Sequence, residues 1–138
     1  MSGRVFLDTN IFLYADDLDA GPKREVAREI LRDAFTSGTG VLSTQVLQEY
    51  FVVATRKLGV DAAVASRKVE LMATLDVVRI EVAEILAAID LHRLHSFSLW
   101  DALIVRCAAT AGCSRLLSED MQVGRVISGV RIDNPFAG

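Results

Sequence analysis

The stretch Val5–Ala15, VFLDTNIFLYA, decides how the fold begins. Val5–Leu7 is apolar and short enough to be a buried strand, and Asp8 stands where that strand should reach the surface. Two more polar residues, Thr9 and Asn10, follow before the apolar pattern resumes. An acid directly after a buried strand either caps the next helix or belongs to a site at the edge of a sheet. This stretch alone leaves both interpretations open.

The composition is that of one globular domain. Of the 138 residues, 51% are hydrophobic and 24% are charged, and a chain of this length buries a core without disulfides. No apolar run approaches the roughly 18 residues of a membrane span, and the N-terminus does not resemble a signal peptide. Two cysteines, Cys107 and Cys113, are too few for a disulfide framework. We therefore expect a single domain over residues 1–138, cytoplasmic and without a membrane partner, with reduced thiols.

Short apolar segments alternate with segments of helical spacing. The segments that predict strands are 3–7, 40–43, 77–80, 115–117 and 130–132, and those that predict helices are 21–37, 44–58, 61–75, 82 to the histidines at 92 and 95, and 98–112. This alternation predicts an α/β fold with a mainly parallel central sheet of four or five strands and helices on both faces. Sites in such sheets form beyond the carboxyl ends of the strands.

Four acids stand apart from the solvated charge pattern, and each has an ordinary structural explanation. Asp8 can cap the helix that follows it. Glu49 can be a flank residue of an amphipathic helix, and Asp120 an unremarkable loop acid. Asp101 follows Ser98 by three residues, which is the spacing of a capping box. Only their order and contexts together point to a site.

The charge balance permits a nucleic-acid partner despite a net charge of −3. Without the four acids named above, 15 basic residues face 14 acidic ones. The basic residues gather in 23–32, 56–57 and 67–68, where each cluster is expected to be the solvated face of a helix. The surface outside the acidic site is therefore close to neutral.

Two further signals are weak. His92 and His95 have the spacing of a zinc pair, but a structural zinc ion needs four ligands and no cysteine or third histidine is near in sequence. Trp100 could stack on a nucleobase, although its apolar neighbours favour packing in the core.

Four segments resemble the motifs of PIN-domain nucleases, and specifically of VapC-type toxin ribonucleases from bacterial toxin–antitoxin pairs. The segments are FLDTNIFLYA (6–15), QVLQEYFVVATRKLG (45–59), SFSLWDALIVRCAATAGC (96–113) and LLSEDMQVGRVISGVRIDNPF (116–136). The resemblance covers essentially the whole chain and implies a PIN fold. It places the family's catalytic, metal-binding acids at Asp8, Glu49, Asp101 and Asp120, with Thr9, Asn10 and Ser118 as supporting polar groups. Ser118 stands where the family often has threonine, a change that keeps the hydroxyl.

Convergence of the four acids, which the resemblance implies, has a physical consequence. Carboxylates about 6 Å apart repel by roughly 3 kcal/mol per pair at an effective dielectric constant near 20. Six such pairs exceed the ~5–15 kcal/mol net stability of a typical domain. Such a cluster must bind protons or cations. Oxygen ligands favour a hard ion, so Mg²⁺ or Mn²⁺ is the expected cofactor.

Glu119 is the middle residue of the last motif, at a position that varies in the family. The resemblance aligns Ser118 and Asp120 with the family's closing motif and leaves Glu119 outside the site. If the chain is still extended there, residues 118 and 120 point to one face and residue 119 to the other. We therefore expect Asp120, rather than Glu119, to be the fourth acid.

The resemblance implies a metal-dependent endoribonuclease that is the toxin of a type II toxin–antitoxin pair, with an RNA substrate, a cognate antitoxin and a homodimeric assembly. A phosphatase of the haloacid dehalogenase type fits poorly, because that chemistry needs a second Asp where this chain has Asn10. A housekeeping PIN nuclease and an inactive PIN-like module that binds RNA or protein are also compatible with the resemblance. The presence of all four acids counts against an inactive module.

Overall fold

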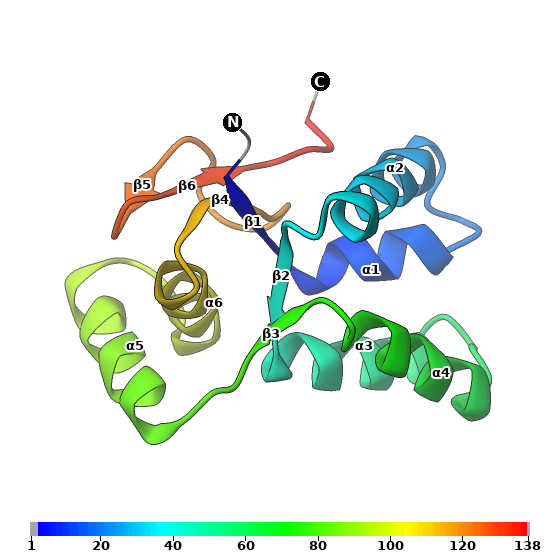
Figure 1. Ribbon diagram of the computed structural model, residues 1–138, viewed down its shortest axis with the longest axis horizontal. Helices are drawn as coiled ribbons and strands as arrows, with labels where there is room; N and C mark the ends of the chain where they lie inside the picture. Colours follow the sequence, from blue (N-terminus) through cyan, green and yellow to red (C-terminus); the bar gives the residue numbers. More distant parts are fainter. Residues whose placement is uncertain (1–2, 138) are drawn as a thin grey trace.

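The computed structural model describes residues 3–137, which form six helices and six strands (Figure 1). In chain order the elements are β1 (Arg4–Leu7), α1 (Thr9–Asp16), α2 (Pro22–Ser37), β2 (Gly40–Ser43), α3 (Thr44–Arg56), α4 (Ala62–Met72), β3 (Asp76–Val78), α5 (Val82–Leu94), α6 (Leu99–Thr110), β4 (Cys113–Leu117), β5 (Val126–Ile127) and β6 (Val130–Asp133).

One sheet runs through the molecule in the order β3-β2-β1-β4-β6-β5. Every neighbouring pair is parallel except β5 with β6. This arrangement confirms the predicted α/β fold with a mainly parallel sheet. The alternation did not predict β5, because two residues are too few to show a pattern. The chain turns from β5 into β6 at Ser128 and Gly129, which both have positive φ angles (52° and 80°), as a tight hairpin turn requires.

Several helix ends follow from local sequence signals. Pro22 occupies the first turn of α2, and Gly38 ends that helix with a left-handed φ of 72°. Asp61 caps α4 and Ser98 caps α6 by accepting hydrogen bonds from backbone amides of the first turn. The bounds of the third strand differ from the prediction: the strand was expected at 77–80 and is observed as Asp76–Val78.

The register of the sheet brings distant chain segments to one edge. Leu7 at the end of β1 pairs with Leu117 at the end of β4, and the Asp8 amide donates to the Leu117 carbonyl oxygen at 3.1 Å. Asp8 and Ser118 therefore leave neighbouring strands at the same edge. β2 lies on the other side of β1 and ends at Ser43. The carboxyl ends of three adjacent strands thus meet beside the first turn of α1.

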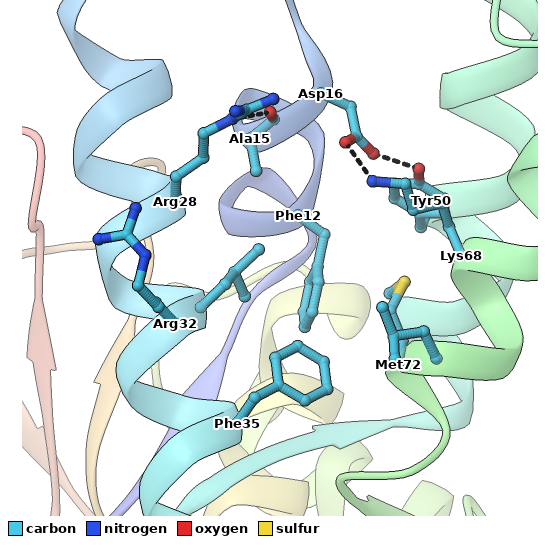
Figure 2. A pocket seen from close by; sticks show the side chains of 11 residues that line it. Phe12, Ala15, Asp16, Arg28, Arg32, Phe35, Tyr50, Lys68 and Met72 are labelled. Atoms are coloured by element: carbon cyan, nitrogen blue, oxygen red, sulfur yellow. Dashed lines mark hydrogen bonds and ion pairs between the residues drawn. The ribbon is translucent and has the colours of Figure 1, made fainter.

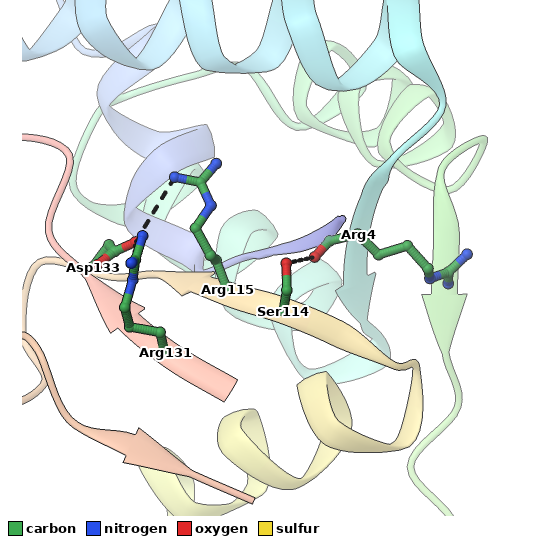
Figure 3. Close-up of polar contacts among 5 residues, drawn as sticks. All are labelled: Arg4, Ser114, Arg115, Arg131 and Asp133. Carbon is green, nitrogen blue, oxygen red and sulfur yellow. Dashed lines mark hydrogen bonds and ion pairs between the residues drawn. The ribbon is translucent and has the colours of Figure 1, made fainter. Parts of the chain in front are cut away.

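Helices cover both faces of the sheet, as predicted. On one face α6 buries a run of apolar side chains that includes Leu103, Val105 and Cys107. On the other face α2 packs over β1 and β2. β4 and β6 also carry polar side chains: Arg115 and Arg131 both pair with the Asp133 carboxylate, at 3.7 and 3.0 Å (Figure 3). Exposed ion pairs of this kind contribute little to stability.

The two cysteines form no disulfide. Cys107 and Cys113 are both free and buried, and burial raises the pKa of the Cys107 thiol to about 12. Within residues 3–137, no helix combines the length and the apolar character that crossing a membrane requires.

α2 approaches the sheet closely at Gly40. A Cβ atom added to Gly40 would lie 2.8 Å from the Cβ atom of Ala34 in α2. Carbon atoms do not approach so closely without a shift of one element, so α2 can pack at this height only because residue 40 has no side chain.

We expect Gly40→Ala to lower the free energy of unfolding by about 1–3 kcal/mol, because the added methyl group overpacks this contact. Ala34→Gly in the same chain should restore part of the loss, since it removes the clashing methyl group. Chemical denaturation of the two single variants and the double variant measures the coupling. A Gly40→Ala protein as stable as the parent would show that α2 is free to move outward.

Candidate active site

Asp8 joins the first strand to the first helix and is buried, with 8% of its surface exposed. It is the N-cap of α1, and its carboxylate accepts a 2.7 Å hydrogen bond from the Thr9 amide. Its second oxygen accepts from the Ser118 hydroxyl at 2.8 Å. The capping interpretation of Asp8 is therefore correct, but the cap also presents the carboxylate at the edge of the sheet where three strands end.

Glu49 reaches the same edge from α3. Its Oε1 atom accepts from the Thr9 hydroxyl at 3.3 Å and from the Gln45 amide at 3.1 Å. Thr9 thus contacts two acids, Asp8 through its backbone and Glu49 through its side chain. The first turn of α1 links the two carboxylates.

Asp101 lies in the first turn of α6. The Ser98 hydroxyl caps this helix by accepting from the Asp101 amide at 3.1 Å. Within residues 3–137, the Ser98 backbone amide does not donate to the Asp101 carboxylate, so only half of the capping box forms; the Ser98 side chain still interacts with this carboxyl and lowers its pKa. Gln45 also donates to the Trp100 carbonyl oxygen at 3.5 Å, which ties α3 to the start of α6.

Asp120 and its neighbour Glu119 point to different partners. Asp120 accepts a 2.8 Å hydrogen bond from the Asn10 amide group, in the first turn of α1. Glu119 accepts from the Tyr14 hydroxyl and pairs with the Lys23 ammonium. Lys23 also lies 5.0 Å from the centre of the Tyr14 ring. Asp120 is therefore the acid that faces the rest of the predicted site, while Glu119 is held by α1 and α2.

Electrostatics links Asp8 to Glu49 and Asp101, and Asp101 to Asp120. The pKa of Asp8 is raised to about 6, mainly by burial, with smaller contributions from the charges of Glu49 and Asp101 and against the lowering effect of the hydrogen bonds from Ser118 and Thr9. Burial also raises the pKa of Asp101, with a contribution from the charge of Asp120. Among residues 3–137, however, no three acidic, histidine or cysteine side chains are grouped closely enough to hold a metal ion as they stand. The structure therefore links the acids in pairs and does not group three of them into a metal cage.

The donor set fits a hard divalent cation. It offers four carboxylates, and the most buried of them is destabilised in its ionised form, which is the condition that a nearby cation relieves. Two more polar atoms close to this edge, Ser43 Oγ and Gln45 Oε1, are buried without a hydrogen-bond partner in the part of the chain that the structure describes. Buried unpaired oxygens are usually satisfied by water or by ions.

The comparisons with known proteins identify the family and the fold. The family model of the PIN domain matches residues 5–127. The chain belongs to the PIN domain family. No curated protein sequence matches the chain significantly.

Solved structures share this PIN fold over most of their length. VapC20 of Mycobacterium tuberculosis, a toxin that cleaves the sarcin–ricin loop, superposes with a TM-score of 0.64 at 20% identity, over 81% of this chain and 86% of its own. A toxin–antitoxin complex from Klebsiella pneumoniae gives 0.70 at 21% identity, over 96% and 98%. VapBC2 of Rickettsia felis, bound to a DNA fragment from its promoter, gives 0.67 at 18% identity, over 94% and 97%. At these identities the likeness establishes the fold.

The PIN domain also contains features that the sequence patterns missed or misjudged. Gln45 was not singled out, although its position four residues before Glu49 on one helix is a recognisable signal. The expectation that Trp100 packs in the core is wrong, because 64% of its surface is exposed. Leu103 and Ile104, three and four residues further on, lie on the same face of α6 as Trp100 and are buried, but Trp100 is in the first turn, where that face is left exposed.

A groove of about 420 Å³ lies behind the acids, between α1, α2, α3 and α4 (Figure 2). We call it the α1–α4 groove; its lining includes apolar residues Phe12, Leu31, Phe35, Leu71 and Met72 and charged residues Asp16, Arg28, Arg32 and Lys68. Figure 2 shows the Asp16 carboxylate accepting from the Tyr50 hydroxyl and pairing with Lys68 at 2.9 Å. The groove therefore has an apolar floor and a mainly basic rim.

We expect the burial of Asp8 to oppose folding when its carboxyl group is ionised. In the absence of divalent ions, its contribution to the free energy of unfolding should fall as the pH rises from 3.8 to about 6 and then level off. The loss amounts to about 3 kcal/mol at neutral pH. Asp8→Asn should therefore be more stable than the parent at pH 7.5, by a margin that shrinks at pH 4.

Thermal and chemical unfolding of both proteins in EDTA, across this pH range, measures the difference. Asp33→Asn, which makes the same change at an exposed acid of α2, is the control for the loss of one carboxylate. A margin between Asp8→Asn and the parent that does not vary with pH would contradict the raised pKa.

Proposed function

We propose that this PIN domain is a Mg²⁺- or Mn²⁺-dependent endoribonuclease that hydrolyses phosphodiester bonds of RNA in the cytoplasm, as the toxin of a type II toxin–antitoxin pair. The observation that carries the proposal is the buried Asp8 carboxylate, whose pKa is raised by burial and by two other acids of the same site. Such a site favours a bound cation. The fold shared with a toxin that cleaves the sarcin–ricin loop supports RNA as the substrate.

We assign to the acids the roles that the resemblance to PIN nucleases implies. Asp8, Asp101 and Asp120 would hold the ion, and Glu49 would bind it directly or through water. A bound ion of this kind lowers the pKa of a water ligand and neutralises charge on the phosphate.

The polar groups around the acids keep the carboxylates oriented. Ser118 and the Thr9 amide direct the two oxygens of Asp8, and Asn10 directs Asp120. The Thr9 hydroxyl and Gln45 direct Glu49. Because these donors come from α1, α3 and the loop after β4, the site is assembled only in the folded chain, and outer groups of this kind usually matter for metal affinity.

We expect the purified protein to cleave single-stranded RNA with Mg²⁺ or Mn²⁺ and to lose this activity in excess EDTA. Asp101→Asn and Asp120→Asn should lower the rate by orders of magnitude, because each removes a charge that the ion needs, while Ser118→Ala has an intermediate effect. Glu119→Gln is the matched control, since it removes a neighbouring charge that is directed at Tyr14 and Lys23.

The same variants allow a readout without activity. Mn²⁺ should raise the melting temperature of the parent and of Glu119→Gln, but not that of Asp120→Asn. Undiminished cleavage in EDTA would refute the metal mechanism. If Glu119→Gln were as inactive as Asp120→Asn, the fourth acid of the site would be Glu119. If Asp101→Asn destabilised the fold but kept the cleavage rate, Asp101 would serve only to cap its helix.

We further propose two protein partners, an antitoxin and a second copy of the chain. Two solved structures of the same fold carry titles that name a toxin–antitoxin complex and VapBC2, and this supports an antitoxin. The α1–α4 groove suits a partner segment with apolar side chains flanked by acids. The exposed apolar residues Val82 and Leu86 of α5, at 70% and 59% exposure, support a homodimer.

We expect expression of the protein alone to arrest growth, and co-expression of the small protein encoded beside it to restore growth. Arg32→Glu, at the rim of the α1–α4 groove, should weaken this rescue and the co-purification of the two proteins without changing RNA cleavage. Arg67→Glu makes the same charge change on α4 outside the groove and serves as the control. If the protein cleaves RNA at the full rate but is harmless when overproduced, it is a housekeeping PIN nuclease. If it does not cleave RNA, it is an inactive PIN-like module.

A further inference from the structure

Trp100 is exposed although it is the largest apolar side chain of the protein. Its surface is 64% exposed, whereas Phe6, Phe12 and Tyr50 are at most 3% exposed. The aromatic pairs found within residues 3–137 are Tyr14 with Phe136 and His95 with Phe97, and neither includes Trp100. The indole ring therefore contributes little to the folded core.

The backbone that carries this ring is held firmly. Trp100 is the second residue of α6, a helix capped by Ser98. Its carbonyl oxygen accepts from Gln45, and the same amide group donates to Glu49. The next residue is Asp101. A rigid segment thus displays an exposed aromatic ring one residue away from an acid of the candidate active site.

A positive charge lies near the same end of α6. The guanidinium group of Arg125 packs over the Phe97 ring at 5.3 Å, and one of its nitrogens lies 3.2 Å from His95 Nδ1. His95 and Phe97 belong to the loop that leads into α6. The amino end of α6 adds its own partial positive charge. This end of the helix therefore combines an aromatic ring with charge that complements a phosphate backbone.

We propose that Trp100 stacks on an unpaired base of RNA, next to the phosphate that the acidic site cleaves. Trp100 and Asp101 are consecutive in the first turn of one helix, so a strand whose phosphate reaches Asp101 has its flanking nucleotides within reach of the exposed indole ring. Unpaired bases stack on exposed aromatic rings, largely independently of sequence. The ligand class is single-stranded or loop RNA. The inference depends on the proposed nuclease function for the identity of the strand.

Trp100 is the only tryptophan of the chain, so intrinsic fluorescence reports on this ring alone. The probe is a fluorescein-labelled single-stranded RNA decamer, whose binding is followed by anisotropy in EDTA so that it is not cleaved. We expect unlabelled decamer to quench the tryptophan emission with the same dissociation constant as the anisotropy titration. Trp100→Ala should weaken binding by about 5- to 100-fold, the range of one base–aromatic stack, and Trp100→Phe should recover most of it.

Kinetics separates stacking from a structural role. In Mg²⁺ we expect Trp100→Ala to raise KM and leave kcat and the melting temperature near those of the parent. RNA that binds without changing the emission overturns the stacking role and leaves the nuclease function intact. Emission that changes on dilution of the protein, but not with RNA, also overturns it and assigns the ring to a protein contact. Protein that neither binds nor cleaves RNA overturns both proposals.

Discussion

The buried carboxylate of Asp8 is the constraint on which the rest of the site depends. Parallel pairing of β1 with β4 aligns Leu7 with Leu117, so the Ser118 hydroxyl arrives 2.8 Å from Asp8. Burial and two neighbouring charges raise the pKa of this carboxyl to about 6, so its ionised form is unfavourable in the folded protein. Hydrogen bonds from Ser118 and the Thr9 amide lower the pKa and offset only part of this effect. The packing of the strands and helices around Asp8 must therefore offset the free energy that the buried, ionised carboxylate costs.

Three successive polar residues organise the acids. Asp8 accepts from Ser118, Thr9 donates to Glu49, and Asn10 donates to Asp120. Each contact joins the start of α1 to a segment at least 40 positions away in the chain. This explains why a polar break interrupts two apolar stretches: one helix turn beside the sheet reaches the other elements of the site at once. Loss of one of these contacts would release a carboxylate that its neighbours repel.

The surfaces around the site share elements with it. The α1–α4 groove is lined by α1 and α3, the helices that also carry Asn10 and Glu49. Trp100 stands on the other flank, at the start of α6, and Gln45 bonds to both Trp100 and Glu49. A partner in the groove and a base on the indole ring would therefore contact the same framework that orients the acids. Binding and catalysis can be coupled through helices that are already packed together.

Local patterns in the sequence were sufficient for most of the elements, although not for the two-residue strand β5, and the candidate acids came from the resemblance of four segments to a family's motifs. The caps at Asp61 and Ser98 and the stop at Gly38 are visible in sequence because they depend on hydrogen bonds and φ angles within a few residues. Which strands pair, and hence that Asp8 meets Ser118, is set by contacts between residues 110 positions apart. The same holds for the exposure of Trp100, because burial depends on how far along one helix face the other elements reach. Only tertiary packing could decide that Leu103 lies inside and Trp100 outside on the same helix.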